Sequence, residues 1–214
     1  MSPNAIELDF AALHATPVAS DPFAHVVVPN FVPPETLQTV VAALPLIGNG
    51  GSYPPGSLRL GPAAKALVQA LEGPELRQAI AEKFGLDLSA APTMLTVRGR
   101  TREKDGRIHT DSKAKKVTVL LYLNPDPGQF TGHHGCLRLL RNATDLDDYA
   151  VEVPPVNGTL LVFPNGPTTW HGHKQFVGPR YAIQLNYMAN DGLARSEMRR
   201  HRLSALVKRL TRAA

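Results

Sequence analysis

The chain has 214 residues, of which 43% are hydrophobic and 19% are charged, a composition typical of globular proteins that excludes disorder throughout. Its single cysteine, Cys136, excludes an internal disulfide bond and any metal site built from several cysteines. The formal net charge is +5, but residues 193–214 hold seven Lys and Arg against one acid, so the rest of the chain is not basic.

The N-terminal part of the sequence, residues 1–92, predicts a short strand followed by helices. The strand is the apolar run His25-Val-Val-Val-Pro29. A helix begins at Pro33-Pro34-Glu35, because proline is tolerated in a first turn and an acid there favours the positive end of the helix dipole. The predicted helices cover about 33–44, 62–72 and 74–84.

After Pro92 the sequence changes to short β-branched or alternating runs bounded by Gly, Pro, Asn or Asp. These runs are 94–100, 107–112, 116–124, 136–141, 150–153, 159–163, 171–176 and 181–188. Such spacing is typical of a sandwich, barrel or jelly roll. We therefore expect one domain over 1–214, mainly β with flanking helices, in which 93–190 form the β core.

The C-terminal segment, residues 191–214, is predicted to form a basic amphipathic helix. Its aliphatic side chains follow the spacing of one helical face: Leu203, Leu206, Val207 and Leu210. The segment either docks on the domain with a solvated basic face or recruits an acidic partner. We do not expect nucleic acid as that partner, because no nucleic-acid motif accompanies the charge.

The chain shows no sign of a membrane or secretory segment. No stretch approaches the ~18 consecutive apolar residues that a membrane span needs. The first residues lack the basic-then-apolar pattern of a secretory signal. We therefore expect a cytoplasmic protein without a membrane span.

Histidine and aspartate side chains are placed to meet in the predicted β core. His109 and Asp111 stand at i and i+2 of a predicted strand, so both point to the same face. A further histidine comes from His171 or His173 in the segment Thr169-Trp-His-Gly-His-Lys174. Two histidines and one carboxylate form the facial triad of non-haem Fe(II) oxygenases, which leaves three metal positions open. The pair taken alone also fits an ordinary hydrogen bond at a strand end.

An arginine follows the second histidine motif within ten residues of sequence. Arg180 lies nine residues after His171, and a turn at Gly178-Pro179 returns the chain to an adjacent strand. An arginine inside a β core needs an anionic partner, and a carboxylate suits its bidentate fork. On the first core strand, either Arg98 or Arg100 faces the pocket, or both lie at the surface.

Together these motifs resemble the Fe(II)/2-oxoglutarate-dependent dioxygenases, and within them the prolyl-hydroxylase-like branch. The resemblance covers about 93–188 and rests on five segments in the family's order: His109-Thr-Asp111, 117–124, 135–139, 157–164 and Arg180-Tyr-Ala-Ile. It implies a double-stranded β-helix, or jelly-roll, core with the N-terminal helices packed on one sheet. Leu121 stands where some prolyl hydroxylases carry a tyrosine that contacts the cosubstrate.

The resemblance also implies a ligand set. Fe(II) would be bound by His109, Asp111 and His171, which form the catalytic centre, with dioxygen as the oxidant. His171 is preferred to His173, because the family's arginine usually follows the histidine by nine or ten residues. Arg180 would bind the distal carboxylate of the cosubstrate 2-oxoglutarate, and Gln184 would line the same pocket.

The implied reaction is hydroxylation of an amino acid, a peptidyl residue or a small metabolite, with release of succinate and CO2. Two other functions fit part of the pattern. A cupin-like isomerase or dioxygenase would keep the three metal ligands without using 2-oxoglutarate. A non-catalytic jelly-roll binding module would use His109 and Asp111 as ordinary polar packing and would bind no iron.

Overall fold

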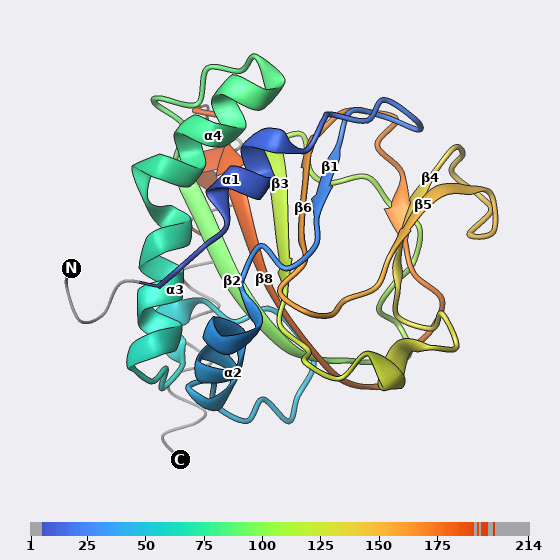
Figure 1. The fold of residues 1–214 in the computed structure, drawn as a ribbon. Coiled ribbons are helices and arrows are strands. Elements are labelled where there is room, and N and C mark those ends of the chain that lie inside the picture. Colours follow the sequence, from blue (N-terminus) through green and yellow to red (C-terminus); the bar gives the residue numbers. More distant parts are fainter. Residues whose placement is uncertain (1–5, 191, 193, 197–198, 200–214) are drawn as a thin grey trace.

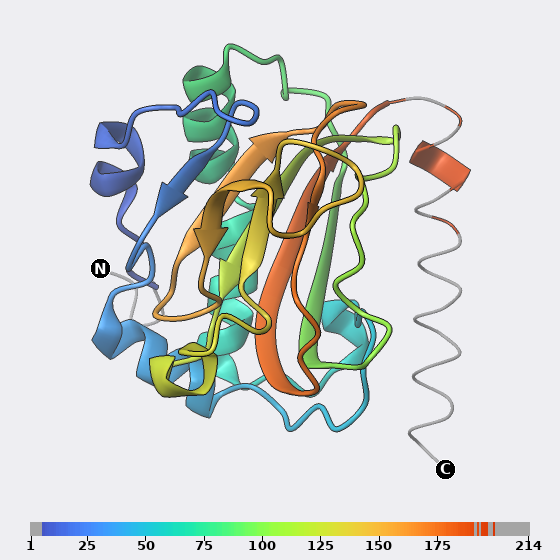
Figure 2. The same cartoon turned by 90° about the vertical axis from the view of Figure 1, so that its right-hand side faces the viewer.

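The computed structural model describes residues 6–190, together with 192, 194–196 and 199. The predicted basic helix over 191–214 lies, for most of its length, outside these residues. In the described part of the chain, two antiparallel sheets lie face to face, and helices cover the outer face of the larger sheet (Figures 1 and 2).

The larger sheet carries the long strands of the fold. Its order is β1 (Val26–Val28), β6 (Leu160–Pro164), β3 (Lys115–Tyr122), β8 (Gly178–Met188) and β2 (Thr93–Thr101). The smaller sheet has the order β5 (Tyr149–Val153), β4 (Leu137–Leu140) and β7 (His171–Gly172). All neighbouring strands are antiparallel, and strands distant in sequence lie side by side. This arrangement confirms the predicted jelly-roll class.

Four α-helices form the layer behind the larger sheet: α1 (Phe10–Ala15), α2 (Pro34–Ala42), α3 (Pro62–Glu72) and α4 (Pro74–Phe84). Two short 3-10 turns, η1 (Pro55–Ser57) and η2 (Pro127–Phe130), lie in loops. Proline occupies the first turn of α2, α3 and α4, and α4 ends at Gly85 in the left-handed conformation. These residues explain why the sequence predicts α3 and α4 with the observed bounds.

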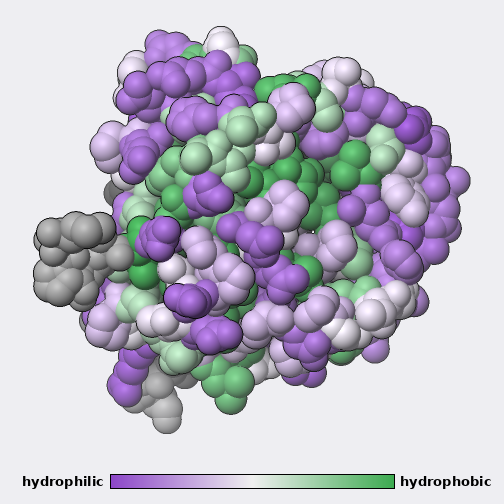
Figure 3. Space-filling view, viewed as in Figure 1, coloured by the Kyte–Doolittle hydropathy of each residue, from purple (hydrophilic) through white to green (hydrophobic). Residues whose placement is uncertain are grey.

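Alternation along β3 divides the protein into an apolar core and a polar pocket. Val117, Val119 and Leu121 pack in the main core between the larger sheet and the helices. The intervening side chains, Thr118, Leu120 and Tyr122, point the other way and line the space between the two sheets. On the face shown in Figure 3, hydrophilic residues cover most of the outer surface, and apolar residues gather between the helical layer and the smaller sheet.

Of the predicted strands, one does not form and another is shorter than expected. Residues 107–112 form no strand, because a single bridge joins them to the sheet: the N–H of His109 and of His171 each donates to the other's carbonyl at 3.0 Å. The strand predicted over 171–176 ends at Gly172, since the next N–H, that of His173, donates to the carbonyl of Gly106 in a turn. The sequence also failed to predict α1, a six-residue helix capped by Asp9.

Candidate functional site

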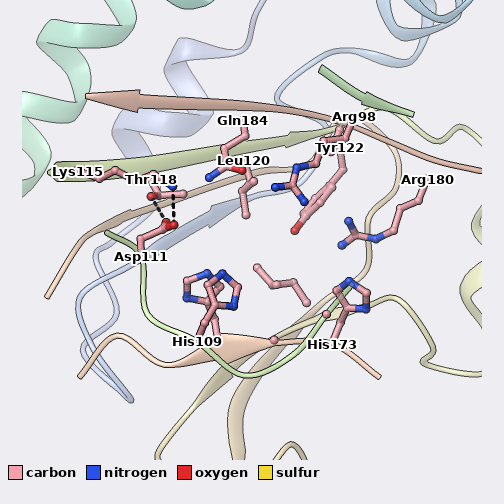
Figure 4. Close-up of a pocket in the computed structure, with 15 residues that line it drawn as sticks. Arg98, His109, Asp111, Lys115, Thr118, Leu120, Tyr122, His173, Arg180 and Gln184 are labelled. Carbon is pink, nitrogen blue, oxygen red and sulfur yellow. Dashed lines mark hydrogen bonds and ion pairs between the residues drawn. The ribbon is translucent and has the colours of Figure 1, made fainter. Parts of the chain in front are cut away.

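A pocket of about 120 Å³ lies between the two sheets. One wall comes from β2, β3 and β8 of the larger sheet, and the other from β4, β7 and the segment that carries His109 and Asp111. Figure 4 shows that polar side chains from both walls point into this space. The sequence-predicted residues His109, Asp111, His171, Arg180 and Gln184 all line it.

Three of these residues meet at one end of the pocket. One nitrogen of His109, one nitrogen of His171 and one carboxylate oxygen of Asp111 all lie within 4.8 Å of one another. The bridge between His109 and His171 brings the two rings to a centroid distance of 4.3 Å. His173, the alternative third histidine, is not part of this group and lies beside Arg180 at the other end (Figure 4).

Backbone carbonyls fix the tautomer of both clustered histidines. Nδ1 of His171 lies 2.9 Å from the carbonyl oxygen of Thr169, and Nδ1 of His109 lies 2.8 Å from that of Arg107. A carbonyl only accepts, so each neutral ring carries its proton on Nδ1. The lone pair of Nε2 is therefore left free in both rings, as a metal ligand requires.

The carboxylate of Asp111 is held from both sides. Lys115 donates from Nζ to Oδ1 at 2.6 Å, and Thr118 donates from Oγ1 to Oδ2 at 2.5 Å. Asn165 in turn donates from Nδ2 to the Thr118 hydroxyl at 2.9 Å. Burial opposes the negative charge, but Lys115, His171 and these hydrogen bonds outweigh it and lower the pKa of Asp111. An ionised carboxylate oxygen that accepts one hydrogen bond still has a lone pair for a metal.

Burial keeps two histidines of the pocket neutral. It lowers the pKa of His171 to about 4, with the positive charge of His109 adding to the effect. It also lowers the pKa of His173 to about 4, with the charge of Arg180 as the next cause. Both rings are therefore uncharged at neutral pH, and no proton competes with a metal at His171.

These two pKa shifts predict an acid-sensitive fold. Both folded-state pKa values lie below the unfolded value of about 6.5, so the unfolded chain takes up protons first as the pH falls. We expect the metal-free protein to lose about 2 kcal/mol of unfolding free energy for each histidine between pH 7.5 and pH 5. The loss begins near pH 6.5 and is complete below about pH 4. Urea unfolding with a chelator present measures it.

A single substitution checks the cause of this acid sensitivity. His173→Asn removes one of the two rings, so it should reduce the loss between pH 7.5 and pH 5 by about half. The same pH dependence in His173→Asn and wild type would contradict this account.

The opposite end of the pocket is cationic. Arg180 is only 7% exposed, and its Nε donates to the carbonyl of Gly135 at 2.8 Å. Its guanidinium carbon lies 5.2 Å from the centre of the Tyr122 ring. No ion pair among the described residues includes Arg180. A buried guanidinium without a carboxylate is costly, which favours an anionic ligand at this end.

Several residues of the pocket were not predicted from the sequence. Tyr122 faces the pocket with a buried hydroxyl that has no hydrogen-bond partner in the described structure, whereas Leu121 points into the apolar core. The alternation of β3 is the signal that identifies both Thr118 and Tyr122 as pocket residues. Arg98, one of the two candidates on the first core strand, lines the pocket, and Arg100 does not.

The residues present fit Fe(II) and 2-oxoglutarate. Two imidazole nitrogens and one carboxylate oxygen are the donor set of a facial triad with open positions. The unpaired guanidinium of Arg180 and the orphaned hydroxyl of Tyr122 fit a carboxylate at the far end.

Comparison with known proteins supports the same assignment. Residues 98–188 match the family model described as the 2OG-Fe(II) oxygenase superfamily. No curated protein matched the chain. No helix in the described part of the chain is long and apolar enough to cross a bilayer.

The fold is shared with solved prolyl hydroxylases. A Pseudomonas putida prolyl-4-hydroxylase is 19% identical with a TM-score of 0.60, and the alignment covers 88% of this chain and 98% of that one. A prolyl 4-hydroxylase of Phytophthora capsici is 17% identical with a TM-score of 0.58, over 91% and 70% of the two chains. A viral collagen prolyl hydroxylase of Paramecium bursaria Chlorella virus-1, in complex with 2-oxoglutarate, is 14% identical with a TM-score of 0.53, over 81% and 99%.

These identities are low, so the solved structures support the fold alone, and the family model supports a likeness over residues 98–188. The matched residues include the segment of His109 and Asp111 and the wall strands β3, β4, β7 and β8, which carry His171 and Arg180. The comparisons therefore match the pocket-bearing part of this chain to the 2OG-Fe(II) oxygenase superfamily, a family of oxidoreductases that use Fe(II), 2-oxoglutarate and dioxygen.

Proposed function

We propose that this protein is a 2-oxoglutarate-dependent hydroxylase, folded as one oxygenase domain, that acts on an amino acid, a peptidyl residue or a small metabolite. The observation that carries the proposal is a single pocket with two different ends. One end gathers two imidazole nitrogens and a carboxylate within 4.8 Å, and the other holds buried Arg180, which forms no ion pair with any described residue. A metal-chelating dicarboxylate matches both ends at once.

In this proposal, His109, Asp111 and His171 are the metal ligands. Fe(II) with 2-oxoglutarate supplies the oxidative chemistry, in which dioxygen converts the cosubstrate to succinate and CO2 and a substrate C–H bond is hydroxylated. The protein contributes the geometry. Thr169 and Arg107 orient the two rings through their carbonyls, while Lys115 and Thr118 hold the carboxylate, so the three donor atoms stay clustered at one end of the pocket.

The cosubstrate would lie along β8. Arg180, Ala182 and Gln184 alternate on the pocket face of that strand, from the arginine end towards the metal end. Arg180 would bind the distal carboxylate through its free N–H groups, and the Tyr122 hydroxyl beside it would donate a further hydrogen bond. Ala182 leaves room above the strand, and Gln184 would line the cosubstrate pocket.

An anaerobic titration of 2-oxoglutarate into the full chain tests this proposal. We expect one equivalent to bind with Fe(II) or Mn(II) present and no binding at micromolar concentration without metal. Release of succinate and CO2 under air then follows from the bound complex. Metal uptake without 2-oxoglutarate binding would overturn the proposal in favour of a cupin-like metalloenzyme, and no metal uptake would favour a binding module.

A further inference from the structure

The pocket carries more positive charge than metal and cosubstrate need. Its charged lining residues are three cations, Arg98, Lys115 and Arg180, and one anion, Asp111. Fe(II) brings two positive charges and 2-oxoglutarate brings two negative charges, so together they leave this balance unchanged. The loaded pocket therefore keeps a surplus of two positive charges. In a site partly closed to water, such a surplus favours an anionic ligand.

Arg98 is a pocket cation that forms no ion pair with the described residues. Lys115 is paired with Asp111 at 2.6 Å, and Arg180 is assigned to the distal carboxylate of the cosubstrate. The Nε of Arg98 is buried without a hydrogen-bond partner, and no ion pair of the described residues includes this side chain. Burial is the largest cause that lowers the pKa of Arg98, and the charge of Arg180 adds to it, whereas the charges of Asp105 and Asp111 oppose the shift without outweighing it.

Arg98 lies apart from the two places assigned to the cosubstrate, which are the metal cluster and Arg180. Arg98 on β2 and Tyr122 on β3 both pair with Ala182, so they flank β8 from opposite sides at the same level. β2 is one of the two edge strands of the larger sheet. In Figure 4 the Arg98 guanidinium lies between the Asp111 end and the Arg180 end and points into the pocket. A group bound there would lie beside the cosubstrate and near the metal ligands.

We propose that Arg98 binds a carboxylate of the substrate, so that this oxygenase acts on a carboxylate-bearing compound. The inference rests on the proposed function, since it assigns Arg180 and the metal cluster to the cosubstrate. The planar guanidinium offers two parallel N–H groups that match a carboxylate. A carboxylate held there would neutralise the unpaired charge and orient the adjacent C–H bonds towards the metal ligands.

Matched pairs of acids and amides test the proposal on the 214-residue chain loaded with Mn(II) and 2-oxoglutarate. The first probes are free L-amino acids, L-proline included, each beside its primary amide. The second are blocked peptides that carry Asp or Glu, each beside its Asn or Gln counterpart. The readouts are thermal unfolding of the Mn(II) complex and stimulation of 2-oxoglutarate consumption by the Fe(II) complex. The two sets distinguish a free acid from a peptide side chain as the source of the carboxylate.

We expect at least one acid to stabilise the loaded protein and its amide to do so at least about tenfold more weakly. Arg98→Gln should remove this difference, and Arg98→Lys should keep part of it. Arg100→Gln is the matched control from the same strand, because Arg100 does not line the pocket, and it should behave as wild type. The ligand-free Arg98→Gln protein should unfold at an unchanged or higher temperature, since it loses a buried unpaired charge.

The outcomes separate this proposal from the one on which it rests. If no acid binds better than its amide, or if Arg98→Gln leaves the preference intact, Arg98 does not bind a substrate carboxylate. If Arg98→Gln loses 2-oxoglutarate as completely as Arg180→Gln does, Arg98 belongs to the cosubstrate site and the proposal fails while the oxygenase function stands. Failure of the wild type to bind 2-oxoglutarate would overturn both.

Discussion

Arg180→Gln is expected to weaken 2-oxoglutarate binding by about 100-fold or more while leaving metal affinity within about threefold. The buried guanidinium is the cation at the end of the pocket opposite the metal cluster, and glutamine cannot supply a charge or a bidentate fork. Its Nε bond to Gly135 holds the fork in place, so the binding geometry is formed before the ligand arrives. Anaerobic calorimetry with the Mn(II)-loaded protein measures both affinities.

Two further variants make this result specific. Arg180→Lys keeps the charge without the fork and should recover only part of the affinity. Arg141→Gln changes an exposed arginine that pairs with Asp21 at the surface, and it should bind 2-oxoglutarate as wild type does. Equal affinity in Arg180→Gln and wild type would show that the distal carboxylate binds elsewhere, and the cosubstrate assignment of Arg180 would be wrong.

The helical part of the fold was predictable because its ends are marked in the sequence. Proline at the first turn of α3 and α4, with glycine at 73 and 85, sets the ends of both helices. The short helix α1 was not predictable in this way. Six residues are fewer than two turns, so they show little periodicity, and its Asp9 cap resembles an ordinary turn residue.

The strand pattern was a poor guide to the secondary structure around His109 and Asp111. Alternation over 107–112 predicts a strand, but hydrogen-bonding partners decide whether one forms, and this segment has only its bridge at His109. His109 and Asp111 nevertheless converge, because residues two apart in an extended chain point to the same side even without a continuous ladder. The geometry needed for the candidate metal ligands therefore survives an error in secondary structure.

The remaining pocket residues depend on which strands become neighbours. Arg98 and Tyr122 are 24 residues apart and line the same pocket because β2 and β3 both pair with β8. Asn165 reaches Thr118 because β6 pairs with β3. Sequence periodicity gives the face of a strand, but not the register between strands, so these contacts required the three-dimensional structure.

The choice between His171 and His173 leads to the second large expected effect. His171→Ala should lower Fe(II) or Co(II) affinity by about 100-fold or more, because it removes one of three clustered donors and the open Nε2 lone pair that Thr169 orients. His173→Ala is the matched control, two residues away and also buried, and it should keep metal affinity within about threefold. The visible spectrum of the Co(II) complex reports binding directly and without turnover.

The same pair of variants separates metal loss from unfolding. The His171 ring packs against Phe163 at a centroid distance of 5.2 Å, so its removal also costs packing, and circular dichroism must show both variants folded. His171→Asn keeps more of the side-chain volume and should lose the metal equally. If instead His173→Ala loses the metal and His171→Ala retains it, the donor set assigned from the geometry is wrong. The metal centre would then lie nearer to Arg180, and the two ends of the pocket would not hold metal and carboxylate as proposed.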